Sequence, residues 1–112
     1  MPRFLAVYTM KRSDLTRFRA MPKQEQDRID ALGVPAWKAW EQRNAESIVD
    51  GGGMVGATTR ATVDGIAAGV NDVCGYVVVE AEDAEAAARL FLDHPHITIF
   101  PGDGVDVMPL LT

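Results

Sequence analysis

Apolar residues gather in four short runs, and the runs differ in their internal pattern. Residues 3–9 and 75–80 carry apolar side chains at consecutive positions. Because successive side chains of a strand point to opposite faces, these two runs predict central strands that are covered on both sides. Residues 54–63 and 105–110 instead alternate apolar with polar side chains, which predicts half-exposed edge strands.

Helical patterns occupy most of the chain between the runs. Residues 22–32 follow a proline and are mostly good helix formers, and a second helical segment begins at Pro35. Its stripe, at helical spacing, consists of Trp37, Trp40, Asn44 and Ile48. The two tryptophans are expected to be core anchors, and the alternative is the aromatic wall of a ligand pocket. The glycines at 51–53 are expected to end this helix, the first as its cap. Residues 81–91 predict a third helix, with acidic residues in its first turn.

The remaining segments predict connections. Residues 11–21 are polar and predict a loop, with at most one helical turn. Residues 64–72 predict a loop or an irregular hairpin connection, and 101–104 predict a turn. A short apolar piece at 97–100 is left between the third helix and that turn.

The order of these elements is strand, helix, strand, strand, helix, strand. This order defines the ferredoxin-like βαββαβ pattern, in which the first and third strands are central. The two runs that are apolar on both faces are the first and the third, which agrees with that topology. We therefore predict one α+β domain over residues 1–112, with a four-stranded antiparallel sheet.

The same pattern predicts a homodimer, because both helices of this fold cover one face of the sheet. We expect that face to receive the aliphatic side chains Leu5, Val7, Val77 and Val79. The other face would then carry Phe4, Ala6, Tyr8, Tyr76 and Val78. Leaving large apolar side chains in water forgoes about 1.5–3 kcal/mol each, so a second copy is expected to cover them, with a pocket at the resulting cleft.

Charge and cysteine content restrict the partners. The formal net charge of −5, without a dense cluster of Lys and Arg, argues against nucleic acid and anionic membranes as partners. Cys74 is the single cysteine, so no internal disulfide forms, and it is expected to be a buried small apolar residue. No apolar stretch reaches the length of a membrane span, and no signal peptide is recognisable, which predicts a cytoplasmic protein.

The chain contains few catalytic motifs. Gly51, Gly53 and Gly56 have the spacing of a dinucleotide-binding loop, but that motif follows a strand and opens a helix, whereas here it is expected to follow a helix. No phosphate-binding loop, catalytic triad, paired-carboxylate or Cys-x-x-Cys signature stands out, and we expect no cofactor.

The candidate site residues are a histidine pair and a few polar or aromatic groups. His94 is the candidate general acid or base, because imidazole titrates near neutrality; otherwise it caps the preceding helix. His94 and His96 together are too few ligands for a metal site, which takes three or four. The candidate ligand-binding residues are Tyr8, Trp40, Arg60, Tyr76 and His96, with Glu80 also expected on the open sheet face. Each of them is also a plausible core or surface residue.

Several segments, in their order, resemble the YCII-related family, which includes the DGPF-type proteins. They are residues 48–53 (IVDGGG), 75–81 (GYVVVEA) with the helix at 85–87, the His94–Pro95 step, and 105–110 (VDVMPL). The resemblance implies a dimeric α/β-barrel fold of ferredoxin-like build. Some relatives are thought to be enzymes with a His–Asp pair at a cleft. This chain has no histidine in its first half, so only His94 corresponds.

Three functions remain open on this basis. The first is an enzyme or binding protein that takes a small molecule in the dimer cleft. The second is a non-catalytic dimeric accessory or regulatory module, and the third is metal-dependent chemistry at His94 and His96.

Overall fold

The computed structural model describes residues 1–112 and contains six strands and four helices. Along the chain they are β1 (Arg3–Thr9), α1 (Arg12–Ala20), α2 (Lys23–Arg43), β2 (Ile48–Met54), β3 (Thr58–Thr62), β4 (Gly65–Gly69), β5 (Val73–Glu80), α3 (Ala84–Arg89), α4 (Pro95–Thr98) and β6 (Gly104–Pro109). None of the helices is both long and apolar enough to cross a membrane.

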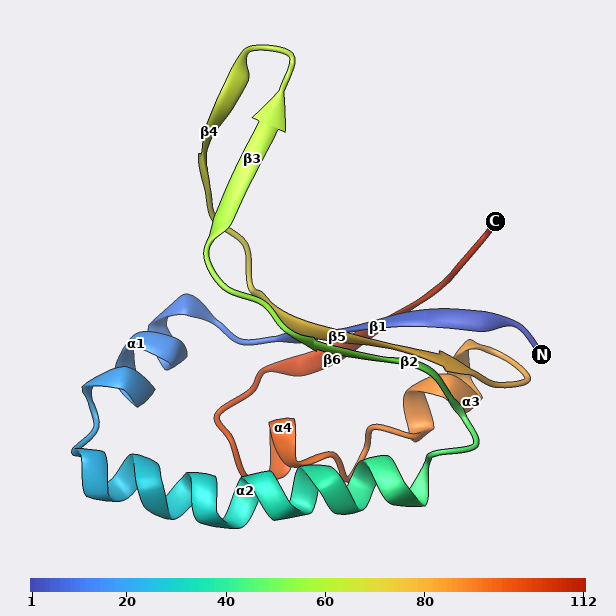
Figure 1. Ribbon diagram of the computed structural model, residues 1–112, viewed down its shortest axis with the longest axis horizontal. Helices are drawn as coiled ribbons and strands as arrows, with labels where there is room; N and C mark the ends of the chain where they lie inside the picture. The colour runs from blue at the N-terminus through green and yellow to red at the C-terminus, as the bar shows by residue number, and fades with distance from the viewer.

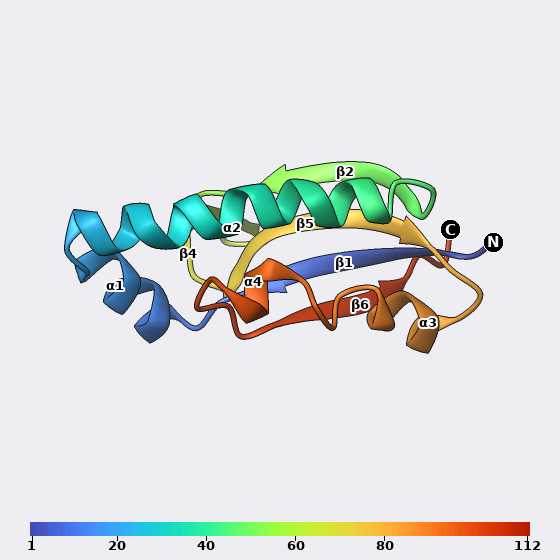
Figure 2. The same cartoon turned by 90° about the horizontal axis from the view of Figure 1, so that it is seen from below.

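Four of the strands form one antiparallel sheet in the order β2-β5-β1-β6. This is the ferredoxin-like arrangement, and it confirms the predicted fold class with β1 and β5 at the centre. All four helices lie on one side of the sheet (Figures 1 and 2). The other two strands, β3 and β4, form a separate hairpin that stands on the opposite side (Figure 1).

The edge strand next to β5 is not the one predicted. It is Ile48–Met54, which contains the glycines that were expected to cap a helix, while Thr58–Thr62 belongs to the hairpin. Glycine lowers strand propensity, so the sequence pattern concealed this strand. Its pairing with β5 is irregular on both sides of Asp50, and Gly52 has a positive φ of 62°. The hydrogen bond from the Gly52 amide to the Asp50 side chain, at 2.8 Å, stabilises this irregular backbone.

The helices also differ from prediction. Residues 12–20, expected to be mainly a loop, form α1, whose Leu15 and Phe18 are half-buried at helical spacing. Residues 23–43 form one helix that runs through Pro35, where a break was expected. A proline inside a helix costs about 3 kcal/mol. C-terminal to the proline, Trp40 lies in the core and Trp37 packs against it, which anchors this half of the helix.

The sheet presents Phe4, Ala6 and Tyr8 to the helices, which reverses the face predicted for β1. Directly opposed residues in an antiparallel pair share a face, and Phe4 pairs with Val79 and Ala6 with Val77. Val77 and Val79 do face the helices as predicted, so this register turns Phe4 and Ala6 the same way. The open face therefore carries Leu5, Val7, Tyr76, Val78 and Met108.

Candidate functional site

A buried cluster of aromatic side chains fills the space between the sheet and the helices. Tyr8 comes from β1, Trp37 and Trp40 from α2, Phe91 from the turn after α3, and His94 from the N-cap of α4. The Tyr8 ring lies 5.0 Å from both the Trp37 and the His94 ring centroids. Trp40 is fully buried and its indole Nε1 donates to the Leu90 carbonyl at 2.7 Å. These contacts hold His94, which is 0% exposed, against the tyrosine.

Hydrogen bonds fix the protonation of the histidines. The backbone N–H of His96 donates to His94 Nδ1 at 2.9 Å, so Nδ1 is unprotonated. A neutral imidazole has one donor and one acceptor nitrogen, so His94 Nε2 carries the hydrogen. That nitrogen lies 3.4 Å from the Tyr8 hydroxyl oxygen and donates to it. The hydroxyl hydrogen of Tyr8 is therefore not used within the cluster.

Burial keeps the cluster neutral. Desolvation, with a smaller contribution from the neighbouring His96, lowers the pKa of His94 to about 4, although Asp93 opposes the shift. Burial also lowers the pKa of His96, whose Nε2 donates to the Thr9 carbonyl at 2.8 Å. Burial raises the pKa of Tyr8 well above its ordinary value, assisted by Glu41. At neutral pH Tyr8 is thus a hydrogen-bond donor rather than a base.

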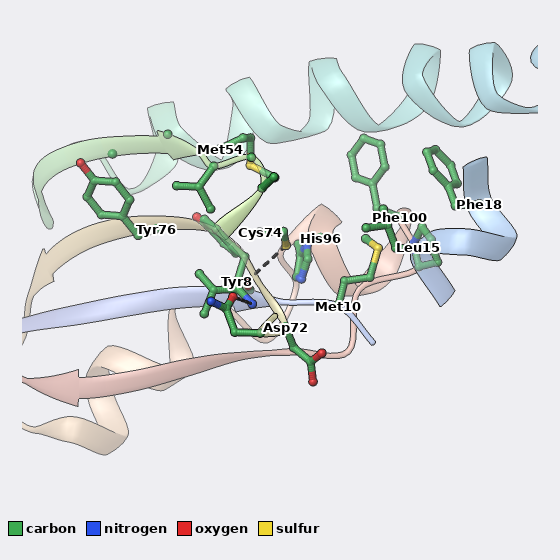
Figure 3. A pocket seen from close by; sticks show the side chains of 18 of the residues that line it. Tyr8, Met10, Leu15, Phe18, Met54, Asp72, Cys74, Tyr76, His96 and Phe100 are labelled. Carbon is green, nitrogen blue, oxygen red and sulfur yellow. Dashed lines mark hydrogen bonds between the residues drawn. The ribbon is translucent and has the colours of Figure 1, made fainter. Parts of the chain in front are cut away.

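A cavity of about 920 Å³ opens beside this cluster, between α1, α2, the ends of β1 and β2, and the base of the hairpin. Tyr8, Trp37 and His96 form part of its wall. Figure 3 shows Met10, Leu15, Phe18 and Phe100 along another part of it. Its volume lies at the upper end of the range for small-molecule sites, and about half of its lining residues are apolar.

Cations outnumber anions at the cavity wall. Arg12, Arg19 and Lys38 line it, against Glu41 and Asp72. None of the three cations takes part in a salt bridge. In a chain with a net charge of −5, this local excess of positive charge favours an anionic ligand.

The structure brings most of the sequence-predicted site residues to this region. Tyr8, Tyr76 and His96 line the cavity. Trp40 and His94 lie behind its wall and do not line it. Arg60 lies on β3, exposed, with its guanidinium 3.4 Å from the Val70 carbonyl, and is not part of the cavity.

Two contributions were missed. Trp37 was predicted on one helix stripe with Trp40, as a core anchor or as the aromatic wall of a ligand pocket, but was not among the candidate ligand-binding residues. The two tryptophans on one stripe were the available signal. Leu15 and Phe18 were placed in a loop; their separation of three residues was the only indication of an apolar helix face.

The site contains no group of three or more His, Cys, Asp or Glu side chains placed to hold a metal ion. Cys74 lines the cavity with its thiol donating to the Tyr8 carbonyl at 3.3 Å, and burial raises its pKa, which disfavours the nucleophilic thiolate.

The fold and this cavity define a ferredoxin-like α+β protein with a cleft of small-molecule size. No family model and no curated protein matches the chain. Among solved structures it is similar to 5-chloro-2-hydroxyhydroquinone dehydrochlorinase (TftG) from Burkholderia phenoliruptrix, in complex with 2,5-dihydroxybenzoquinone. The TM-score is 0.56 at 15% sequence identity, over 94% of this chain and 89% of that one. The similarity supports the fold.

Proposed function

We propose that the protein binds or transforms a small, planar, oxygen-rich anion in the cavity beside Tyr8. The single observation that carries this proposal is the state of the Tyr8 hydroxyl, which accepts from His94 and keeps its own hydrogen for a ligand. Such a donor suits a carbonyl or phenolate oxygen. The aromatic wall suits a flat ring, and Arg12, Arg19 and Lys38 suit a negative charge.

The similar solved structure supports this class of ligand. It holds 2,5-dihydroxybenzoquinone, a flat ring whose acidic hydroxyl groups ionise in water. We propose the YCII-related family as the family of this chain, with His94 positioning Tyr8 rather than touching the ligand.

We further propose that the chain acts as a homodimer through the open face of its sheet. Its accessible surface is 7513 Å², whereas a compact monomer of its mass exposes about 6,100 Å². The excess, about 1,400 Å², is of the size that one subunit buries in a stable dimer. The open face exposes Tyr76 and Met108 and leaves Leu5, Val7 and Val78 half-buried.

Calorimetric titration with 2,5-dihydroxybenzoquinone tests the ligand proposal. We expect saturable binding that Tyr8→Phe weakens about 3- to 10-fold, as loss of one hydrogen bond does. Arg12→Ala is also expected to weaken binding. Arg28→Ala, an exposed arginine of α2 outside the cavity, is the matched control and leaves the affinity unchanged.

Absence of binding by the unmodified protein, to this quinone and to a panel of planar phenolic acids, would contradict the proposal. That result would favour the non-catalytic accessory module. If the Tyr8→Phe variant bound the ligand with the affinity of the unmodified protein, only the role of the Tyr8 hydroxyl would be contradicted.

A further inference from the structure

The β3–β4 hairpin is a two-faced ribbon. Its register places Thr59 opposite Ala68 and Ala61 opposite Ile66, so these four side chains share one face. The other face carries the remaining residues of β3: Thr58, Arg60 and Thr62. A strand pair with one apolar and one polar face is typical of a ribbon that packs against another surface.

No part of its own chain covers the apolar face. Ile66 is 79% exposed, and Val63, at the turn, is fully exposed. β3 and β4 form a sheet with each other alone. An isolated two-stranded hairpin is marginally stable in water, so this ribbon needs a further contact to stay ordered.

The position of the hairpin indicates where that contact lies. It rises from the side of the sheet that the helices leave open (Figure 1). The C-terminal segment, with Leu110 and Leu111 exposed, rises on the same side at the other end of the sheet (Figure 1). A partner molecule bound to the open sheet face would therefore lie beside the hairpin.

We propose that the β3–β4 hairpin is an arm that packs its apolar face against a second copy of this chain. The inference rests on the proposed homodimer and adds a second contact to it. The sheet and the upright hairpin together have the shape of an L. Two such subunits related by a twofold axis would interlock, so each copy would extend one arm and receive one.

Charge and area favour a second copy as the occupant. Between residues 58 and 70 the chain carries one arginine and one aspartate, so the arm has no net charge to attract a nucleic acid or a strongly charged protein. The exposed Val63 and Ile66 of the arm add apolar area to the sheet face that the proposed second copy would cover. The base of the arm, including Thr58 and Gly69, also lines the cavity, so a docked arm would define one part of its rim.

Introducing charge at the tip of the arm, at Val63 and Ile66, tests whether the arm contributes to dimerisation. In the double variant Val63→Asp, Ile66→Asp we expect the dimer dissociation constant, measured by sedimentation equilibrium, to rise at least tenfold. Leu92→Asp is the matched control, because Leu92 is 70% exposed outside the arm. The control is expected to dimerise like the unmodified protein. Val63, Ile66 and Leu92 are all exposed in the monomer, so neither variant is expected to disturb the fold.

Hydrogen exchange gives an independent readout. We expect the amides of residues 59–68 to be protected above the dissociation constant and to exchange rapidly below it. In the tip variant they should exchange rapidly at both concentrations.

The outcomes separate the arm from the proposals on which it rests. A tip variant that dimerises with the affinity of the unmodified protein overturns the arm and leaves the sheet-face dimer standing. An unmodified protein that stays monomeric at millimolar concentration overturns both. Quinone binding, measured on the same samples, tests the ligand proposal apart from either result.

Discussion

At the scale of single residues, one backbone amide determines how a side chain two positions earlier behaves. The His96 N–H occupies Nδ1 of His94 and leaves Nε2 as the donor to Tyr8. The imidazole is enclosed by Tyr8, Trp37 and Trp40, so protonation would place a charge where no water reaches it. His94 therefore orients the tyrosine as a neutral group.

This arrangement makes stability sensitive to acid. The pKa of His94 falls from 6.5 to about 4 on folding, so the unfolded chain binds more protons between these values and is favoured as the pH falls. We expect the unmodified protein to lose about 2–3 kcal/mol more free energy of unfolding than His94→Asn between pH 7.5 and pH 4.5. Urea denaturation at the two pH values measures this difference.

Carboxylates titrate in both proteins, so their contribution to the pH dependence of stability largely cancels when the unmodified protein is compared with His94→Asn. Parallel losses of stability in the two proteins would contradict a buried neutral His94.

At the scale of elements, the irregular strand β2 depends on one glycine. Gly52 has a positive φ, and a side chain there would collide with the backbone of Tyr76 on the neighbouring strand. Gly51, directly before it, has open space where a Cβ would be. We expect Gly52→Ala to destabilise the protein by about 2 kcal/mol or more, and Gly51→Ala by less than about 1 kcal/mol. Thermal or urea denaturation of the two variants measures the difference.

Equal effects at the two positions would show that β2 tolerates another backbone path. A large effect at Gly51 alone would place the irregularity elsewhere in the strand.

The pattern of apolar residues was sufficient for the topology but not for every element. The consecutive apolar residues of β1 and β5 identified the two central strands, since only doubly covered strands carry them. The alternation of apolar and polar residues at 54–63 belongs mainly to the hairpin. The sequence did not predict β2, because glycines such as those at 51–53 also commonly end helices.

The candidate site was less accessible from sequence. Which face of β1 meets the helices depends on the register with β5, a relation between residues some seventy positions apart. The Tyr8–His94 hydrogen bond joins residues 86 positions apart, and no local pattern indicates it. His94, Tyr8 and Trp40 were each selected for their chemistry, whereas their meeting in one cluster follows from the tertiary fold.

At the scale of the whole molecule, the protomer is flat and open. Its extents are 43 × 43 × 18 Å and its radius of gyration is 15.4 Å, whereas a compact domain of this length has about 13 Å. Only 14 of 112 residues are buried, so a single copy has a small core. The proposed homodimer would add apolar burial to this core.

Folding and association should accordingly be coupled. We expect the thermal midpoint of the unmodified protein to rise with protein concentration, because association stabilises the folded state by mass action. Calorimetric scans over a hundredfold range of concentration measure the slope. The charged-tip variant is expected to have a lower midpoint at every concentration, and a midpoint independent of concentration would contradict the coupling.

The cavity shares its rim with the base of the hairpin. In the proposed dimer this position would link two equilibria, ligand binding and subunit association. A ligand that holds the rim in the shape it takes in the dimer must strengthen subunit association, and association must strengthen ligand binding by the same factor. A cell that dilutes or accumulates this protein would thereby change its affinity for the ligand without any change in sequence.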